Sequence, residues 1–100
     1  MIIAKVVGSV VSTSKAEKLY GKKLLVVQPL DMNTIEVDGK PLVSIDTVGS
    51  GVGEVVMVVS GSSARQTETT EGTPVDSAIV GIIDHIEIEG EITFEANKGG

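Results

Sequence analysis

The stretch VGSGVGEVVMVVSGSSARQ, residues 48–66, places a cluster of small residues on each side of the apolar run VVMVV. The apolar run is typical of a buried strand, and the clusters are typical of the loops that flank one. A loop of this kind can bind phosphate through its backbone, or it can let the backbone of another subunit approach closely. The stretch alone leaves both readings open.

The composition predicts one small domain over residues 1–100 with a core of aliphatic side chains. Hydrophobic residues make up 41% of the chain, yet Tyr20 and Phe94 are its only aromatic residues, which favours strands. The absence of Cys excludes a disulfide framework, and a single His85 excludes a His-rich metal site. A Lys, a Gly and a Ser interrupt the apolar N-terminal stretch, so it indicates neither a signal peptide nor a membrane span.

The net charge of −6 is unevenly distributed along the chain. Residues 1–30 carry five Lys and one Glu, whereas residues 31–100 carry thirteen acidic residues against three basic ones. An acidic chain with two aromatic residues lacks the groups that neutralise phosphates and stack on bases, so we expect no nucleic-acid binding. The opposite signs either attract one copy of the chain to another or belong to two differently solvated faces.

Short apolar and alternating runs predict strands separated by turns. We expect strands over residues 2–11, 22–28, 42–47, 54–60, 78–83 and 86–95. Gly8 predicts a bulge in the first strand, and Pro29 predicts the end of the second. Turn-forming residues fill 31–41, with a short hairpin rung at 35–37, and one or two helical turns are expected at 63–66 and from Pro74. The pattern therefore predicts an all-β barrel or sandwich.

The clearest alternation in the chain lies at residues 86–95 and predicts one half-buried strand with an apolar and an acidic face. The apolar face would hold Ile86, Ile88, Ile92 and Phe94, and the acidic face Glu87, Glu89, Glu91 and Glu95. Four neighbouring carboxylates repel one another unless they are solvated or matched by a basic neighbour. The Lys-rich N-terminal region is a candidate for that neighbour.

Catalytic readings of these residues are weak. GSGVG at 49–53 is not a dinucleotide fingerprint, and it precedes a strand, whereas pyrophosphate binding needs a helix N-terminus. The residue types of a hydrolytic triad occur as Ser62, Ser63, Asp84 and His85. Asp84 and His85 are adjacent, so on a strand their side chains would point to opposite faces. We also expect Asp46, Asp76 and Asp84, at strand ends, to bond local backbone.

Three separated motifs, taken in order, resemble the bacterial microcompartment vertex proteins of the EutN/CcmL family. They are STSK at 12–15 with GKKLLVVQPLD at 21–31, IDTVGSGVGEVVMVVSGSSARQ at 45–66, and PVDSAIVGIID at 74–84. The match runs from Met1 to about Ile88. Ser50 departs from the Ala that is more usual between the glycines, and residues 89–100 form the variable C-terminal tail.

The resemblance implies a small five-stranded, OB-like β-barrel with one or two short helical turns. It implies a structural shell protein with no catalysis and no cofactor, which assembles as a homopentamer at the fivefold vertices of a carboxysome or metabolosome. Its partners would be hexameric and trimeric shell proteins in the bacterial cytoplasm, with no nucleic acid and no membrane. The alternative function is an OB-like ligand or nucleic-acid binding module, which the fold alone would permit.

A ring of wedge-shaped subunits brings backbones close together, and small residues allow that approach. We therefore expect both small-residue clusters at the subunit interface or near the ring axis, unless these are turns that the barrel alone requires. The expected interface residues are Gly49, Ser50, Gly51, Gly53, Gly61, Ser62, Ser63, Ala64 and Arg65. As the sole Arg, Arg65 is expected to pair at the interface with one of the carboxylates of Asp46, Glu54, Asp76 and Asp84.

Overall fold

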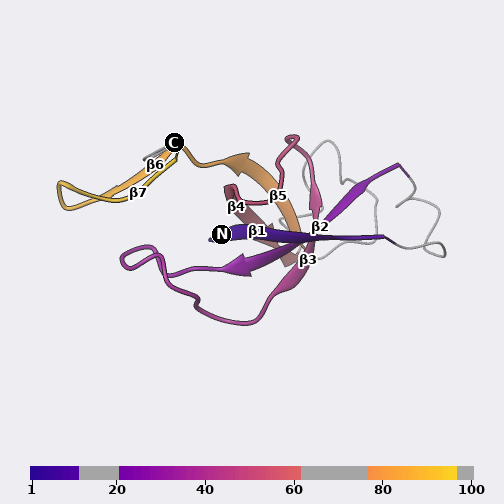
Figure 1. The fold of residues 1–100 in the computed structure, drawn as a ribbon, viewed down its shortest axis with the longest axis horizontal. Helices are drawn as coiled ribbons and strands as arrows, with labels where there is room; N and C mark the ends of the chain where they lie inside the picture. The colour runs from indigo at the N-terminus through magenta and orange to yellow at the C-terminus, as the bar shows by residue number, and fades with distance from the viewer. Residues whose placement is uncertain (12–20, 62–76, 97–100) are drawn as a thin grey trace.

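The computed structural model describes residues 1–11, 21–61 and 77–96, and five of its strands close into a β-barrel (Figure 1). These strands are β1 (Ile2–Val10), β2 (Lys23–Pro29), β3 (Leu42–Asp46), β4 (Val55–Ser60) and β5 (Ser77–Ile82). Their order around the barrel is β1-β2-β3-β5-β4, with every neighbouring pair antiparallel except β3 and β5. The predicted five-stranded all-β barrel is confirmed.

Small and β-branched side chains fill the barrel. Alternate residues of each strand point inward, as the period of a strand requires. The inward cluster consists of Ala4, Val6, Leu25, Val27, Val56, Val58 and Ile79, each no more than 1% exposed. β4 is apolar on both faces because Val59 joins a second cluster, with Ile45 of β3 and Ala78 of β5.

Buried hydroxyls reinforce the parallel pairing of β3 and β5, in which two residue pairs lie in register. Ser77 Oγ donates to the carbonyl oxygen of Val43 at 2.8 Å, so the Ser44 hydroxyl is the donor in its 2.5 Å bond to Ser77 Oγ. Thr47 Oγ1 donates to the carbonyl oxygen of Ile79 at 2.6 Å. Because both serines are buried and bonded, the barrel closes without leaving these polar groups unsatisfied.

The predicted irregularities of the first two strands are confirmed. The β1–β2 register shifts between Val6 and Gly8, which leaves Val7 as a bulge with its side chain 48% exposed. β2 ends at Pro29, and an isolated bridge from Leu30 to Val37 forms the expected rung in the turn-rich segment. Val7 keeps the outward direction that follows buried Val6, and the bulge leaves it without a register partner beside Gly8, which pairs with Val26.

The prediction of one strand over residues 86–95 is wrong. These residues form a hairpin of β6 (His85–Ile88) and β7 (Glu91–Glu95), which projects from one end of the barrel (Figure 1). Glu89 and Gly90 make its two-residue turn, both with positive φ (50° and 83°), as a type I′ turn requires. An Asn-Gly or Asp-Gly pair is the usual signal for such a turn, and Glu-Gly lacks it.

The expected loop at 12–20, the helical turns at 63–66 and from Pro74, and the loop at 67–73 lie outside the described residues. The residues that the structure describes contain no helix long and apolar enough to cross a membrane.

Candidate subunit interface at the β3–β4 loop

The carboxylate of Asp46, at the end of β3, organises the loop that follows it. Its side chain is 2% exposed, and its Oδ1 accepts hydrogen bonds from Ser50 Oγ at 2.9 Å and from the backbone N–H of Val48 at 3.2 Å. Lys23 of β2 lies beside it, with Nζ 3.9 Å from Asp46 Oδ2 and 2.5 Å from the carbonyl oxygen of Ser50. The predicted bonding of Asp46 to local backbone is confirmed.

The other end of the loop is attached to the β1 bulge. The backbone N–H of Gly53 donates to the carbonyl oxygen of Val6 at 2.8 Å, and the Val6 N–H donates to that of Glu54 at 2.9 Å. Glu54 also bonds Gly51 twice, through its side chain at 2.8 Å and its N–H at 3.2 Å. The loop is thus held by both of its flanks and has a defined shape in the single chain.

The three glycines of this loop differ in what they require of the chain. Gly49 and Gly53 have φ of 78° and 97°, a region that favours glycine, so the turn itself explains them. Gly51 does not have positive φ, and an added Cβ would meet only Glu54 Oε1 at 3.9 Å, an ordinary contact. Nothing in the described chain therefore requires glycine at position 51.

Two apolar side chains of the loop face solvent in the single chain. Val52 is 67% exposed and Val48 is 39% exposed, whereas Ser50 between them is completely buried. An exposed apolar tip on a rigid loop is typical of a contact surface. We define the contact loop as residues 47–54.

The structure separates the predicted interface residues into groups. Gly49, Gly51 and Gly53 lie together on the contact loop, while Gly61, with φ of 66°, follows β4. The Ser50 hydroxyl is committed to Asp46, so its side chain contributes to the loop and not to an outer surface. Ser62, Ser63, Ala64 and Arg65 lie outside the described residues.

The sequence did not single out Lys23 or Glu54 as residues that shape the loop. Glu54 follows Gly51 by three residues, a spacing at which a side chain can accept a hydrogen bond from a loop N–H. This spacing is visible in the sequence and could have predicted the bond. Lys23 lies 27 positions from Ser50, and no local pattern connects them. Two carboxylates proposed for Arg65, those of Asp46 and Glu54, already have partners within the chain.

The described residues offer no catalytic constellation. They contain no group of three or more His, Asp or Glu placed to hold a metal ion. Asp84 and His85 are exposed at the base of the hairpin, and the serines of the considered triad lie outside the described residues. A shallow cavity of about 280 Å³ joins Gly53 and Glu54 of the contact loop to Phe94, Glu95 and Ala96 of the hairpin.

A closed OB-like barrel with an anchored, apolar-tipped loop defines the class of small all-β barrel proteins. The chain belongs to the family described as "Ethanolamine utilisation protein EutN/carboxysome", whose model matches residues 1–84. It is 52% identical over 87 residues to the microcompartment shell vertex protein GrpN of Rhodospirillum rubrum, an alignment that covers 87% of this chain and 97% of that protein. It is 46% identical to the carboxysome shell vertex protein CcmL of Synechocystis, covering 100% and 99%.

Solved structures agree with this assignment. The Nostoc CcmL structure superposes with a TM-score of 0.89 at 44% identity, over 95% of this chain and 99% of that chain. A structure described as the pentameric microcompartment shell protein GrpN of Rhodospirillum rubrum gives 0.80 at 50% identity, over 88% and 99%. The resemblance seen in the motifs is confirmed, and the relatives that the chain matches over most of its length are named as microcompartment shell vertex proteins. These relatives are named as shell vertex proteins and not as enzymes, in agreement with the expectation of a non-enzyme.

Proposed function

We propose that the chain, as one domain of residues 1–100, forms a homopentamer at the fivefold vertices of a microcompartment shell in the bacterial cytoplasm. It lies there beside hexameric and trimeric shell proteins and closes the polyhedron. The contact loop carries this proposal, because it combines a fixed shape, an exposed apolar tip and a glycine that the chain itself does not require. A relative of similar fold is named as pentameric, which supports the number five.

The first prediction concerns mass and assembly. Five chains of 10.3 kDa give about 51.5 kDa, which light scattering on the purified protein at micromolar concentration should report. Mixed with hexameric shell proteins, the pentamer should yield closed particles in electron micrographs, because hexagonal tiles alone form sheets or tubes. A stable monomer would contradict the pentamer, and equal numbers of closed particles without this protein would contradict the vertex role.

The second prediction separates interface from fold at Gly51. Gly51→Ala should change the free energy of unfolding by less than about 1 kcal/mol, since neither φ nor space opposes a methyl group. It should raise the concentration at which the ring dissociates by about tenfold or more, because overpacking a close contact costs roughly 1–3 kcal/mol. Sedimentation velocity over a dilution series measures the dissociation.

Gly53→Ala is the matched control for an effect on the fold. The φ of Gly53 is 97°, so the same methyl group should lower the free energy of unfolding of the single chain by about 1–2 kcal/mol. If the Gly51→Ala ring dissociates as the wild-type ring does, position 51 is not at a close subunit contact.

A further inference from the structure

The β6–β7 hairpin has an outer face that the rest of the described chain does not cover. Side chains of directly paired residues lie on the same face of a hairpin, so Glu87 and its partner Ile92 share one face, together with His85 and Glu95. Ile92 is 56% exposed, and His85, Glu87 and Glu95 are exposed. We call these four residues the outer hairpin face: one large apolar side chain beside two carboxylates and an imidazole.

One side-chain hydrogen bond ties the hairpin to the turn at Met32, and one backbone hydrogen bond closes its base. Thr93 Oγ1 donates to the carbonyl oxygen of Met32 at 2.7 Å, and the Ala96 N–H donates to that of Asp84 at 2.7 Å. The turn that carries Met32 is itself braced by Asp31, whose carboxylate accepts the N–H groups of Thr34 and Asn33. The hydrogen bond from the Thr34 N–H, and then that from the Asn33 N–H, lower the pKa of Asp31 below its ordinary range. The outer hairpin face is therefore presented outward by an anchored arm.

A second uncovered surface lies on the outside of β1, β2 and β3. Val26 pairs with Val43 on one side and with Gly8 on the other, and Gly8 has no side chain that could cover the two valines. Val7, next to Gly8 in the chain, also faces outward. Val7 and Val43 are 48% and 46% exposed. We call Val7, Val26 and Val43 the valine face.

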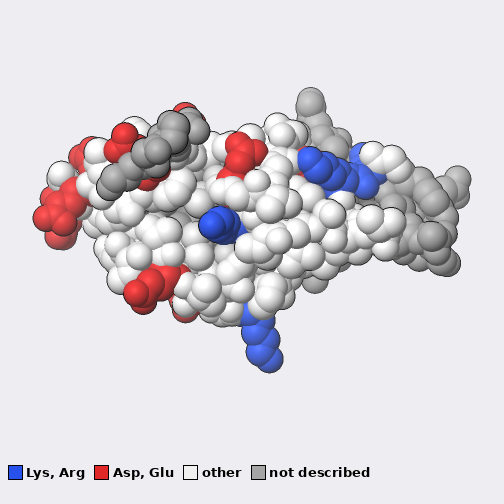
Figure 2. Space-filling view, viewed as in Figure 1, with Lys and Arg blue, Asp and Glu red and all other residues white. Residues whose placement is uncertain are grey.

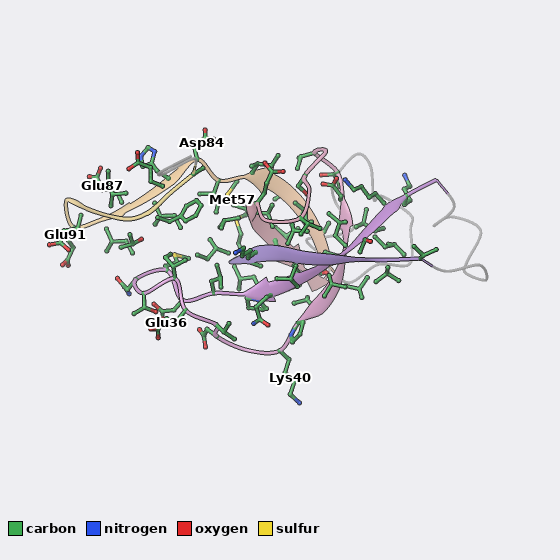
Figure 3. The ribbon with its side chains drawn as sticks, viewed as in Figure 1. Glu36, Lys40, Met57, Asp84, Glu87 and Glu91 are labelled. Atoms are coloured by element: carbon green, nitrogen blue, oxygen red, sulfur yellow. The ribbon has the colours of Figure 1, made fainter. Side chains whose placement is uncertain are left out.

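Lysines flank the valine face. Lys5 is exposed and pairs in register with Gln28, whose Nε2 donates to the carbonyl oxygen of Gly39 at 2.9 Å, so the segment that bears Lys40 lies on the same side. Lys40 projects away from the chain (Figure 3). Figure 2 shows acidic residues over the hairpin and the adjacent turn at one end of the molecule, a further acidic group at the upper middle, and basic residues at the centre, the bottom and the upper right. The two surfaces are alike in having apolar centres and opposite in charge.

We propose that the outer hairpin face of one copy docks on the valine face of the next copy, with Glu87 and Glu95 beside the neighbour's lysines. This inference rests on the proposed ring. A ring closed by head-to-tail contacts needs two different, complementary surfaces on each copy, and these two qualify. The cavity that joins Gly53 and Glu54 to Phe94 and Glu95 makes the hairpin continuous with the contact loop.

The family model ends at residue 84, immediately before the hairpin. The hairpin thus lies outside the part that the family model matches, and in this proposal it strengthens a ring that the contact loop also holds together. Losing this docking should weaken the pentamer without abolishing it.

The third prediction is a charge exchange. Lys5→Glu with Lys40→Glu, and separately Glu87→Lys with Glu95→Lys, should each raise the dissociation concentration of the ring about tenfold or more at low salt, since like charges then face each other. Combining all four substitutions should restore it to within about threefold of wild type. High salt should reduce every difference. Sedimentation velocity over a dilution series measures the dissociation of the wild type, the two double variants and the fourfold variant.

Glu36→Lys is the matched control, because Glu36 is an exposed acid on the turn next to the hairpin but on neither face. Ile92→Ser tests the apolar centre and should weaken the ring without any salt dependence. The docking is overturned if the double variants dissociate as wild type does, or if the fourfold variant is no better than either double variant. Wild-type protein that is itself monomeric would refute the ring, which the mass measurement decides separately.

Discussion

Ile79→Ala should lower the free energy of unfolding by about 2–5 kcal/mol, the range for deleting a fully buried large aliphatic side chain. Ile79 is completely buried in the barrel and lies on β5, in register with Val58 of β4 and Asp46 of β3. It thus occupies the seam where the parallel pair closes the barrel. The missing atoms would leave a cavity that β-branched neighbours, with few rotamers, cannot fill. Urea unfolding followed by circular dichroism, at one fixed protein concentration, measures the change.

A graded series makes this result specific to packing. Ile79→Val should cost only about 0.5–1.5 kcal/mol. Val11→Ala removes aliphatic atoms from a side chain that is 91% exposed and should change the stability by less than about 0.5 kcal/mol. If Ile79→Ala is as stable as Val11→Ala, the barrel interior is not closed around Ile79.

The barrel could be predicted from the sequence because its signals are local. β-branched runs separated by Gly, Pro and Asp define each strand, and Gly8 and Pro29 mark where the first two strands become irregular. Closure is not local, because it depends on the parallel pairing of Ile45 with Ala78. The expectation of a barrel or sandwich left that pairing open, and only the family resemblance specified five strands.

The hairpin shows how a correct alternation can give a wrong strand. The two-residue turn at Glu89–Gly90 places Ile88 and Glu91 on one face and so reverses the pattern after the turn. The β7 bulge at Thr93 reverses it again and returns Phe94 to the face of Ile86. Both ends of the segment therefore fit a single strand, and Glu91 and Ile92, between turn and bulge, are the residues that change face.

The contact loop could be located from its glycines, but its internal bonds could not. Small residues at 49–53 predicted a loop between two strands, which the structure has, while the same reasoning placed Ser50 on an interface, and its hydroxyl is buried against Asp46. Composition identifies where a backbone can approach closely. Which side chain points inward depends on tertiary partners such as Lys23, far away in the sequence.

Asp46→Ala should destabilise both the chain and the ring, because Asp46 organises the contact loop. Its loss removes the acceptor for Ser50 Oγ and the Val48 N–H, and Ser50 is completely buried. A buried donor without a partner costs about 1–3 kcal/mol, so unfolding stability should fall by at least that amount. A loosened loop also has to be ordered again on association, and the ring should dissociate at about tenfold or higher concentration. Urea unfolding and sedimentation velocity measure the two effects.

Asp46→Asn is the control that separates hydrogen bonding from charge. Asn keeps an oxygen that can accept both bonds and loses only the attraction to Lys23, whose side chain is 54% exposed and whose Nζ lies 3.9 Å away. Because Lys23 is largely exposed and the 3.9 Å separation is long, the pair contributes under about 1 kcal/mol although Asp46 is buried, so the Asn variant should remain close to wild type in both measurements. If Asn and Ala variants are equally damaged, the ion pair and not the hydrogen bonding shapes the loop. If Asp46→Ala unfolds more easily yet keeps the wild-type ring, then the shape of this loop is not what holds the subunits together.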